Sequence, residues 1–176
     1  GQVRHVEDGE GDYGVTESLI RDLLVAANPN VHLPPPTGVP NRTPMSALSP
    51  ETYLGYQYQS QYLANPSYLP DQPSTYQFPS SLPTGYTAVA GTWTVGSEEM
   101  TAGTRAQIEV AFEADDVYLV LGGTGTLDVS LNGKHTKTIT VSGLPRLYTL
   151  QRGPYQASTL TLSASPGIQA YDFTFG

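Results

Sequence analysis

Apolar and polar residues alternate in short runs through the second half of the chain, a pattern typical of half-buried β-strands. Leu127, Val129 and Leu131 occupy every second position, and Asn132-Gly133 directly after them favours a type I′ hairpin turn. The pattern predicts strands at 92–95, 106–112, 117–121, 126–131, 136–141, 147–150, 159–162 and 169–175. Short strands separated by turn residues predict an all-β sandwich or barrel.

The beginning of the chain has a different periodicity. Between residues 16 and 27, one apolar stripe predicts an amphipathic helix, which ends before Pro29 because the residue preceding proline avoids the α region. The stripe consists of Leu19, Ile20, Leu23 and Leu24. Alternation over 2–7 predicts a short strand, and the Gly- and Asp-rich run 8–14 predicts a turn.

One strand and one helix cannot form a core of their own. Burying an aliphatic side chain is worth about 1.5–3 kcal/mol, so we expect the helix stripe to be packed against something. The candidates are a sheet supplied by another polypeptide, the β-rich second half of this chain, or a second copy.

The middle of the chain is rich in proline and then in tyrosine. Residues 29–45 contain six prolines and predict a semi-rigid, extended linker. Residues 49–87 are rich in Tyr, Gln, Ser and Pro; they predict a first strand at 51–57 and another near 76–78. The predicted organisation is therefore an N-terminal segment 1–28, a linker 29–45 and a β-domain 46–176.

Charge and composition exclude several functions. The 16 acidic and 8 basic residues give a net charge of −8, which repels duplex DNA and anionic lipid, so we expect no nucleic-acid partner. The sequence contains no cysteine, which excludes disulfides, thiolate metal sites and thiol–disulfide chemistry within it. The apolar stretch at 23–27 is too short to span a bilayer.

Few residues suggest a catalytic or metal site. His5, His32 and His135 are scattered and predict surface positions rather than a zinc site. In the acid pairs Glu98-Glu99 and Asp115-Asp116, neighbours on a strand would point to opposite faces, so neither pair alone suits a glycosidase. Turn chemistry explains Asp115-Asp116 between two predicted strands. Together with Asp172, these are the only plausible ligands for a structural calcium. No cofactor is indicated.

Aromatic residues are the better binding candidates, because sugars bind on exposed aromatic faces. Trp93 shares a strand face with Val95, which favours a place in the core, and a platform for sugar is the alternative. Tyr56, Tyr58, Tyr62 and Tyr68 alternate with glutamines and suit a carbohydrate site equally well as the cover of a sheet edge.

Several blocks of the sequence resemble DipZ proteins. Residues 1–7, 9–13, 16–17 and 23–24 are similar to the end of their thioredoxin domain. Their C-terminal sandwich is similar to residues 50–55, 116–120, 122–127 and 171–176. These blocks extend over nearly the whole chain.

This resemblance implies a mainly β fold: a jelly-roll-type β-sandwich, similar to carbohydrate-binding modules, preceded by the last strand and helix of a thioredoxin fold. It also implies the C-terminal region of an extracytoplasmic thiol–disulfide protein of cytochrome c biogenesis type, membrane-anchored through a part outside this sequence. The chain itself is then not an enzyme, since it lacks the Cys-x-x-Cys pair. The implied partners are cell-envelope carbohydrate and a thioredoxin-like domain. The alternative is a structural or homodimerisation module that binds no sugar.

Overall fold

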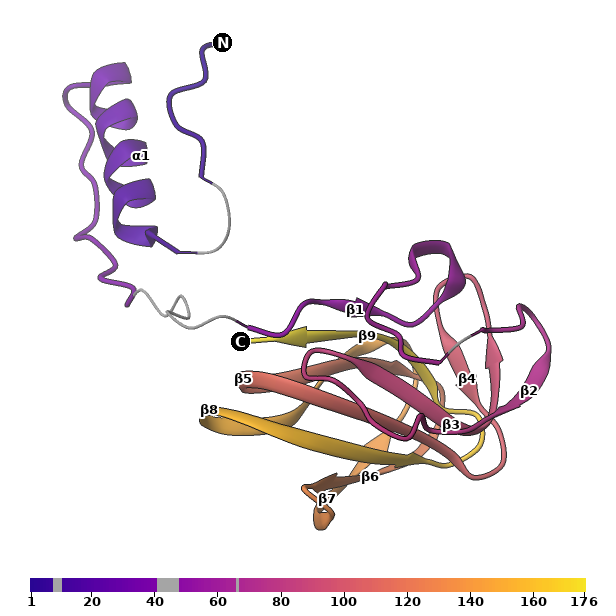
Figure 1. Ribbon diagram of the computed structural model, residues 1–176. Coiled ribbons are helices and arrows are strands. Elements are labelled where there is room, and N and C mark those ends of the chain that lie inside the picture. Colours follow the sequence, from indigo (N-terminus) through magenta and orange to yellow (C-terminus); the bar gives the residue numbers. More distant parts are fainter. Residues whose placement is uncertain (8–10, 41–47, 66) are drawn as a thin grey trace. The chain divides into compact units, whose positions relative to one another are not determined.

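The chain is mainly β, with one helix near its N-terminus, as predicted (Figure 1). The computed structural model describes residues 1–7, 11–40, 48–65 and 67–176. The chain divides into two compact units, Gly1–Met45 and Ser46–Gly176, which are described separately below.

In the first unit, helix α1 runs from Tyr13 to Ala27, so it begins earlier than the sequence predicts. Its C-terminus is closed by Asn28, whose N–H donates to the Leu24 carbonyl at 3.0 Å. The predicted strand at 2–7 is wrong, because residues 1–7 have no regular structure and pair with no described strand. Residues 8–10 of the predicted turn lie outside the described residues. In the predicted linker, residues 31–40 form neither helix nor strand.

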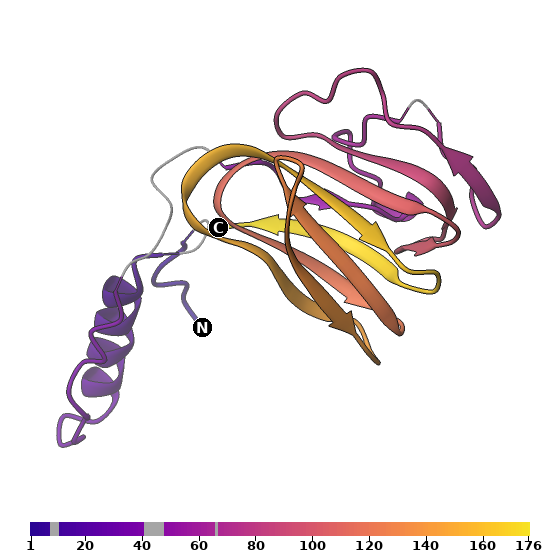
Figure 2. The same ribbon diagram turned by 90° about the horizontal axis from the view of Figure 1, so that it is seen from below.

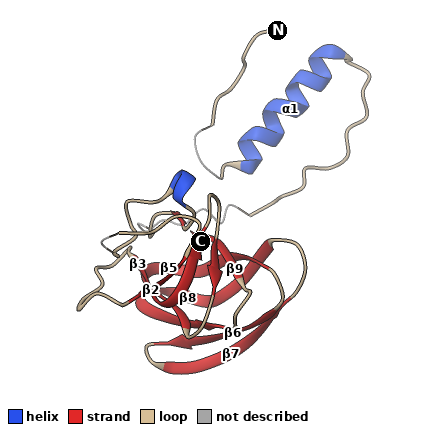
Figure 3. Cartoon of the chain, turned by 90° about the vertical axis from the view of Figure 1, so that its right-hand side faces the viewer, coloured by secondary structure: helices blue, strands red, loops and turns tan. Residues whose placement is uncertain are grey.

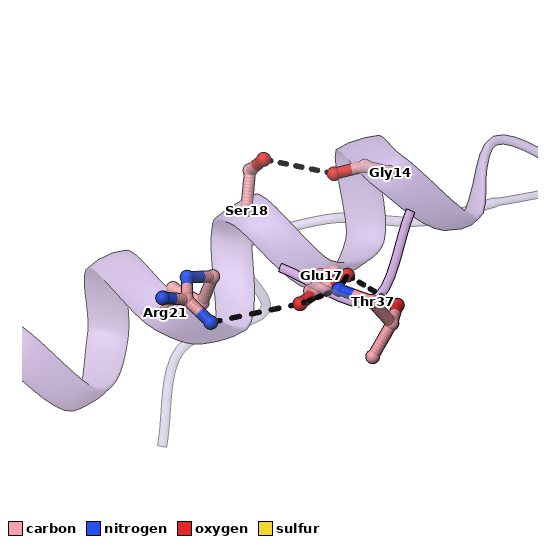
Figure 4. A network of polar contacts seen from close by, with 5 residues as sticks. All are labelled: Gly14, Glu17, Ser18, Arg21 and Thr37. Carbon is pink, nitrogen blue, oxygen red and sulfur yellow. Dashed lines mark hydrogen bonds and ion pairs between the residues drawn. The ribbon is translucent and has the colours of Figure 1, made fainter. Parts of the chain in front are cut away.

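A polar network connects α1 to the segment that follows it (Figure 4). The Glu17 carboxylate accepts hydrogen bonds from the Thr37 N–H at 3.1 Å and from the Thr37 hydroxyl at 2.6 Å. Arg21, one turn further along, lies 3.6 Å from Glu17 Oε1. The hydrogen bonds from Thr37 lower the pKa of Glu17, and the charge of Arg21 adds to this effect. The returning segment is therefore held alongside the helix by a charged group.

The apolar stripe of α1 is incompletely covered. Leu19 is half-buried, whereas Ile20, Leu23 and Leu24 are 53%, 44% and 46% exposed. The expectation that this stripe is packed against something stays a prediction. No helix among the described residues is long and apolar enough to cross a membrane.

The second unit contains the strands and one short 3₁₀ helix (Figure 3). The elements are β1 Thr52–Tyr53, η1 Tyr56–Tyr58, β2 Pro73–Tyr76, β3 Thr87–Val95, β4 Met100–Ala102, β5 Ala106–Gly122, β6 Gly125–Leu131, β7 Lys134–Val141, β8 Arg146–Ala164 and β9 Gln169–Phe175. The strand predicted at 51–57 is therefore two residues long and gives way to η1. The hairpin turn is in place, since Asn132 and Gly133 both have the positive φ (49° and 77°) that a type I′ turn requires.

Two strands each join two segments that the sequence predicts as separate strands. β5 joins the segments predicted at 106–112 and 117–121, and β8 joins those at 147–150 and 159–162. The turn predicted at Asp115-Asp116 is wrong, because both of its N–H groups donate to the Gly176 carbonyl, at 2.9 and 2.7 Å. Register shifts at these residues absorb the irregularity as a bulge, and the strand continues.

The sheet closes on itself, and Figures 1 and 2 show it strongly curled. β3 pairs with β4 and with the first part of β5, while β9 pairs with β4 and with the last part of β5. These four strands form a ring. β8 runs along β5, and β6 and β7 extend the sheet beyond β8. β1 and β2 add to β9 and β3 respectively.

The core lies inside this curled sheet. Trp93, Phe112 and Phe173 are its largest fully buried side chains. The described residues of the first unit contribute none of the buried apolar side chains. The second unit thus has a complete core of its own.

Candidate functional site

A hollow of about 200 Å³ opens on the surface of the second unit beside β1, η1 and β9. Three tyrosines and two carboxylates are among the residues that line it. The lining consists of Tyr53, Gly55, Tyr58, Ser97, Glu98, Tyr171 and Asp172. It combines aromatic surface with groups that accept hydrogen bonds, the arrangement expected of a site for a polar ring.

Three separate parts of the chain form the hollow. β1 pairs with β9 so that Tyr53 lies opposite Asp172, which brings a ring and a carboxylate side by side. The next residues bind to the turn between β3 and β4: the N–H groups of Tyr56 and Gln57 donate to the carbonyls of Gly96 and Ser97 at 3.0 and 2.9 Å. This turn presents Glu98 to the hollow.

Gly55 allows this close approach. A Cβ at this position would lie 2.3 Å from the carbonyl carbon and 2.5 Å from the Cα of Glu98. Both are backbone atoms, so they cannot rotate away. A glycine is therefore needed where the β1–η1 segment crosses the turn that carries Glu98.

The rings of Tyr53 and Tyr58 meet at an angle, with centroids 6.2 Å apart and planes inclined by 58°. Tyr58 is the more open of the two, 63% exposed against 42%. The Tyr53 hydroxyl donates to Glu51 Oε2 at 3.2 Å, and this hydrogen bond together with the Glu51 charge raises the pKa of Tyr53. The raised pKa keeps the Tyr53 phenol protonated, and both rings border the hollow.

The other predicted tyrosines lie outside the hollow lining. Tyr56 donates its hydroxyl to Asp71 at 3.2 Å, which raises the pKa of the phenol. Tyr62 packs edge-on against Tyr86. Tyr68 is half-buried against the core and donates to Asn65 Oδ1 at 2.7 Å; burial raises its pKa. Of the four predicted tyrosines, Tyr58 alone is in the lining.

Trp93 is not a surface platform. Its side chain is fully buried, and its Nε1–H donates to the Ala90 carbonyl at 2.9 Å. A ring without an accessible face cannot stack on a sugar, so its proposed place among the binding residues is corrected to a place in the core.

The remaining candidates are dispersed. Asp116 accepts from the Tyr118 hydroxyl at 2.7 Å and lies 3.3 Å from Arg152, while Asp172 is in the hollow. The described residues contain no cluster of three or more His, Asp and Glu side chains that could hold a metal ion. His135 is exposed on β7, 3.8 Å from Asp128.

Tyr53, Glu98, Tyr171 and Asp172 were missed as a group by the sequence analysis. Tyr53 belongs to β1, Glu98 to the turn between β3 and β4, and Tyr171 and Asp172 to β9. Only the pairing of β1 with β9 and the hydrogen bonds of Tyr56 and Gln57 to that turn bring them together. The local signals were Tyr53 and Tyr171-Asp172, which lie in two of the blocks noted for their family resemblance.

Comparison with known proteins identifies relatives of the whole chain. Residues 49–176 match a family model described as "Thioredoxin like C-terminal domain". The full chain is 41% identical over 180 aligned residues to Protein DipZ of Mycobacterium bovis and of Mycobacterium tuberculosis. The resemblance to DipZ is thereby confirmed. The chain spans 26% of the length of these curated relatives.

Solved structures give more distant similarities. A family two carbohydrate esterase from Cellvibrio japonicus has a TM-score of 0.47 and 11% identity, covering 51% of this chain and 30% of that one. CsCBM6-3 from Clostridium stercorarium, solved with cellobiose, has a TM-score of 0.36 and 16% identity, covering 64% of this chain and 88% of that one.

Proposed function

Since the chain belongs to the family described as thioredoxin like C-terminal domain, we propose that it is the non-catalytic C-terminal region of an extracytoplasmic, membrane-anchored thiol–disulfide protein. In this proposal the second unit is a jelly-roll-type β-sandwich that binds carbohydrate of the cell envelope. Homology to DipZ along the whole chain supports the first part. The absence of cysteine means that redox chemistry would belong to another part of the protein.

The tyrosine-lined hollow is the observation that supports sugar binding. Tyr53, Tyr58 and Tyr171 supply apolar ring surface, and Glu98 and Asp172 supply acceptors for sugar hydroxyls. Its volume of about 200 Å³ is smaller than a drug-sized pocket of roughly 300–1,000 Å³. It therefore suits one sugar ring at the end or side of a chain. Binding would hold a redox domain near its substrates and raise their effective concentration.

Truncating Tyr58 tests this function. We expect a glycan array on the full chain to identify a ligand, and Tyr58→Ala to weaken its binding about tenfold, equal to about 1.4 kcal/mol. Tyr58 is exposed, so the variant should keep the parent's melting temperature. Titration calorimetry measures the affinity.

Tyr155→Ala is the matched control. Tyr155 lies on β8 outside the hollow lining and is 40% exposed, close to the value for Tyr53. The Tyr155→Ala variant should bind the ligand with the affinity of the parent. Absence of any glycan ligand, or equal losses in Tyr58→Ala and Tyr155→Ala, would contradict a sugar site in the hollow.

The structural alternative, a module that packs on a thioredoxin-like domain or forms a homodimer, is supported by a different feature. The half-exposed stripe of α1 offers apolar surface that a partner could cover. Sedimentation of the full chain distinguishes the two roles, since a dimer without glycan binding would favour the structural one.

A further inference from the structure

The hollow is bordered by carboxylates that take part in no ion pair among the described residues. Glu98 and Asp172 line it, and Glu51 is bound to the hydroxyl of Tyr53 on its wall. The ion pairs among the described residues lie elsewhere, at Glu7, Glu17, Asp116 and Asp128, and none includes these three carboxylates. A ligand that brings positive charge would meet uncompensated acids.

The pKa values of two lining groups are raised by burial and by neighbouring carboxylates. Burial raises the pKa of Asp172, and the charge of Glu51 raises it further. Burial likewise raises the pKa of Tyr171, with added contributions from Glu99 and Glu98. Asp172 and Tyr171 therefore each lie close to carboxylates on another segment of the chain, Glu51 in the first case and Glu98 and Glu99 in the second.

The aromatic rings add a second attraction for a cation. Tyr53 and Tyr58 are inclined to one another by 58°, so their faces do not stack but border a common space. The negative face of an aromatic ring attracts an ammonium group within about 6 Å of the centroid. Rings and carboxylates in one small hollow are the elements of a site for an organic cation that also has apolar surface.

We propose that the hollow recognises a sugar bearing a protonated primary amine, an amino sugar without its acetyl group. The C–H face of such a ring packs on tyrosine, while the ammonium approaches Glu98 and Asp172. This inference rests on the proposed carbohydrate-binding function and specifies its ligand class. A neutral sugar would leave both carboxylates without a cationic partner.

The experiment compares two probes that differ only in the acetyl group. Trimers of β-1,4-linked glucosamine and of N-acetylglucosamine are titrated into the full chain at a pH where the amine is protonated and the carboxylates are ionised. We expect the amine-bearing trimer to bind at least tenfold more tightly at low salt. The difference should shrink as salt rises, because charge attraction between exposed groups is screened.

Charge-removing variants separate the hollow from the general acidity of the chain. Glu98→Gln and Asp172→Asn should each reduce the preference for the amine several-fold. Glu109→Gln removes the same charge from β5, outside the hollow lining, and should leave the preference unchanged. Melting temperatures confirm that each variant is folded.

The outcomes distinguish this inference from the function it rests on. Equal binding of both trimers, still weakened by Tyr58→Ala, would keep the sugar site and overturn the amine preference. A preference reduced equally by Glu109→Gln would mean that net charge alone attracts the probe and would also overturn it. Binding of neither trimer nor any other glycan would overturn the sugar site as well.

Discussion

Two buried polar residues at the entrance to β3 illustrate how differently single side chains are accommodated. Asn65 is buried and uses its whole amide: Nδ2 donates to the carbonyls of Gln77 and Val89, and Oδ1 accepts from the Val89 N–H and the Tyr68 hydroxyl. Thr87 is fully buried, but its hydroxyl has no hydrogen-bond partner among the described residues. Asn65 connects the tyrosine-rich loop to the sheet through these hydrogen bonds. The Thr87 hydroxyl loses its hydration on folding and gains no hydrogen bond from the described residues in return.

Thr87→Val should therefore stabilise the protein. The replacement has nearly the same shape, and a buried hydroxyl left unpaired costs about 1–3 kcal/mol. We expect a gain of about 1 kcal/mol, which corresponds to a rise in melting temperature of roughly 3–6 °C. Calorimetry measures it. Thr140→Val on the exposed face of β7 is the control and should change little. A lower melting temperature for Thr87→Val would contradict the reasoning.

For single residues, the sequence predicted burial correctly where the neighbours along one strand determine which face a side chain occupies. Trp93 beside Val95 on a strand face indicated the core, and the side chain is fully buried. It failed where the environment is made by distant segments. Tyr58 was predicted as a binding residue, but nothing in the local pattern shows that it shares a hollow with Tyr171.

At the scale of elements, the sequence located most strands of the second unit but not β4, and it placed several strand ends wrongly. β6, β7 and β9 agree closely with the alternation of apolar residues. The separate segments predicted within β5 are joined because the Asp115 and Asp116 N–H groups bind the Gly176 carbonyl. Acidic residues favour turns locally, but a long-range hydrogen bond at a bulge overrides that preference.

Helix α1 gives a pH-dependent prediction. Thr37 lowers the pKa of Glu17 below its usual value of 4.5, chiefly through its hydroxyl and then its N–H. A lowered pKa means that the ionised form is favoured in the folded state. The network therefore contributes fully above pH 4.5 and is lost as the pH falls through the lowered pKa of Glu17.

Amide hydrogen exchange at Thr37 measures this loss. The protection factor of this amide, the intrinsic exchange rate at the same pH divided by the measured rate, should fall several-fold below that pKa, and Glu17→Gln should lower it at neutral pH as well. Asp22→Asn removes a charge from the same helix, but Asp22 does not accept from Thr37, so it serves as the control. Unchanged exchange in Glu17→Gln would show that the carboxylate does not hold the returning segment.

At the scale of the whole molecule, the closed ring of β3, β5, β9 and β4 determines which part of the chain can be removed without loss of the β-fold. Each ring strand lies within Ser46–Gly176, as do all the buried apolar side chains of the described core, from Leu54 to Phe173. Residues 1–45 contribute a helix with no buried residue. A chain cut at the boundary between the units keeps every ring pairing.

We therefore expect residues 46–176 to fold alone. Expressed by itself, this segment should give a β-type circular dichroism spectrum, one cooperative thermal transition and a melting temperature within about 3 °C of the β-unit transition in the full chain. The complementary segment 1–45 is the control: an isolated helix of this length is marginal in water, so it should be largely unfolded. A disordered spectrum for 46–176 would refute the prediction. A melting temperature lowered by more than about 5 °C would instead mean that the first unit stabilises the second, and would favour the structural role over the sugar site.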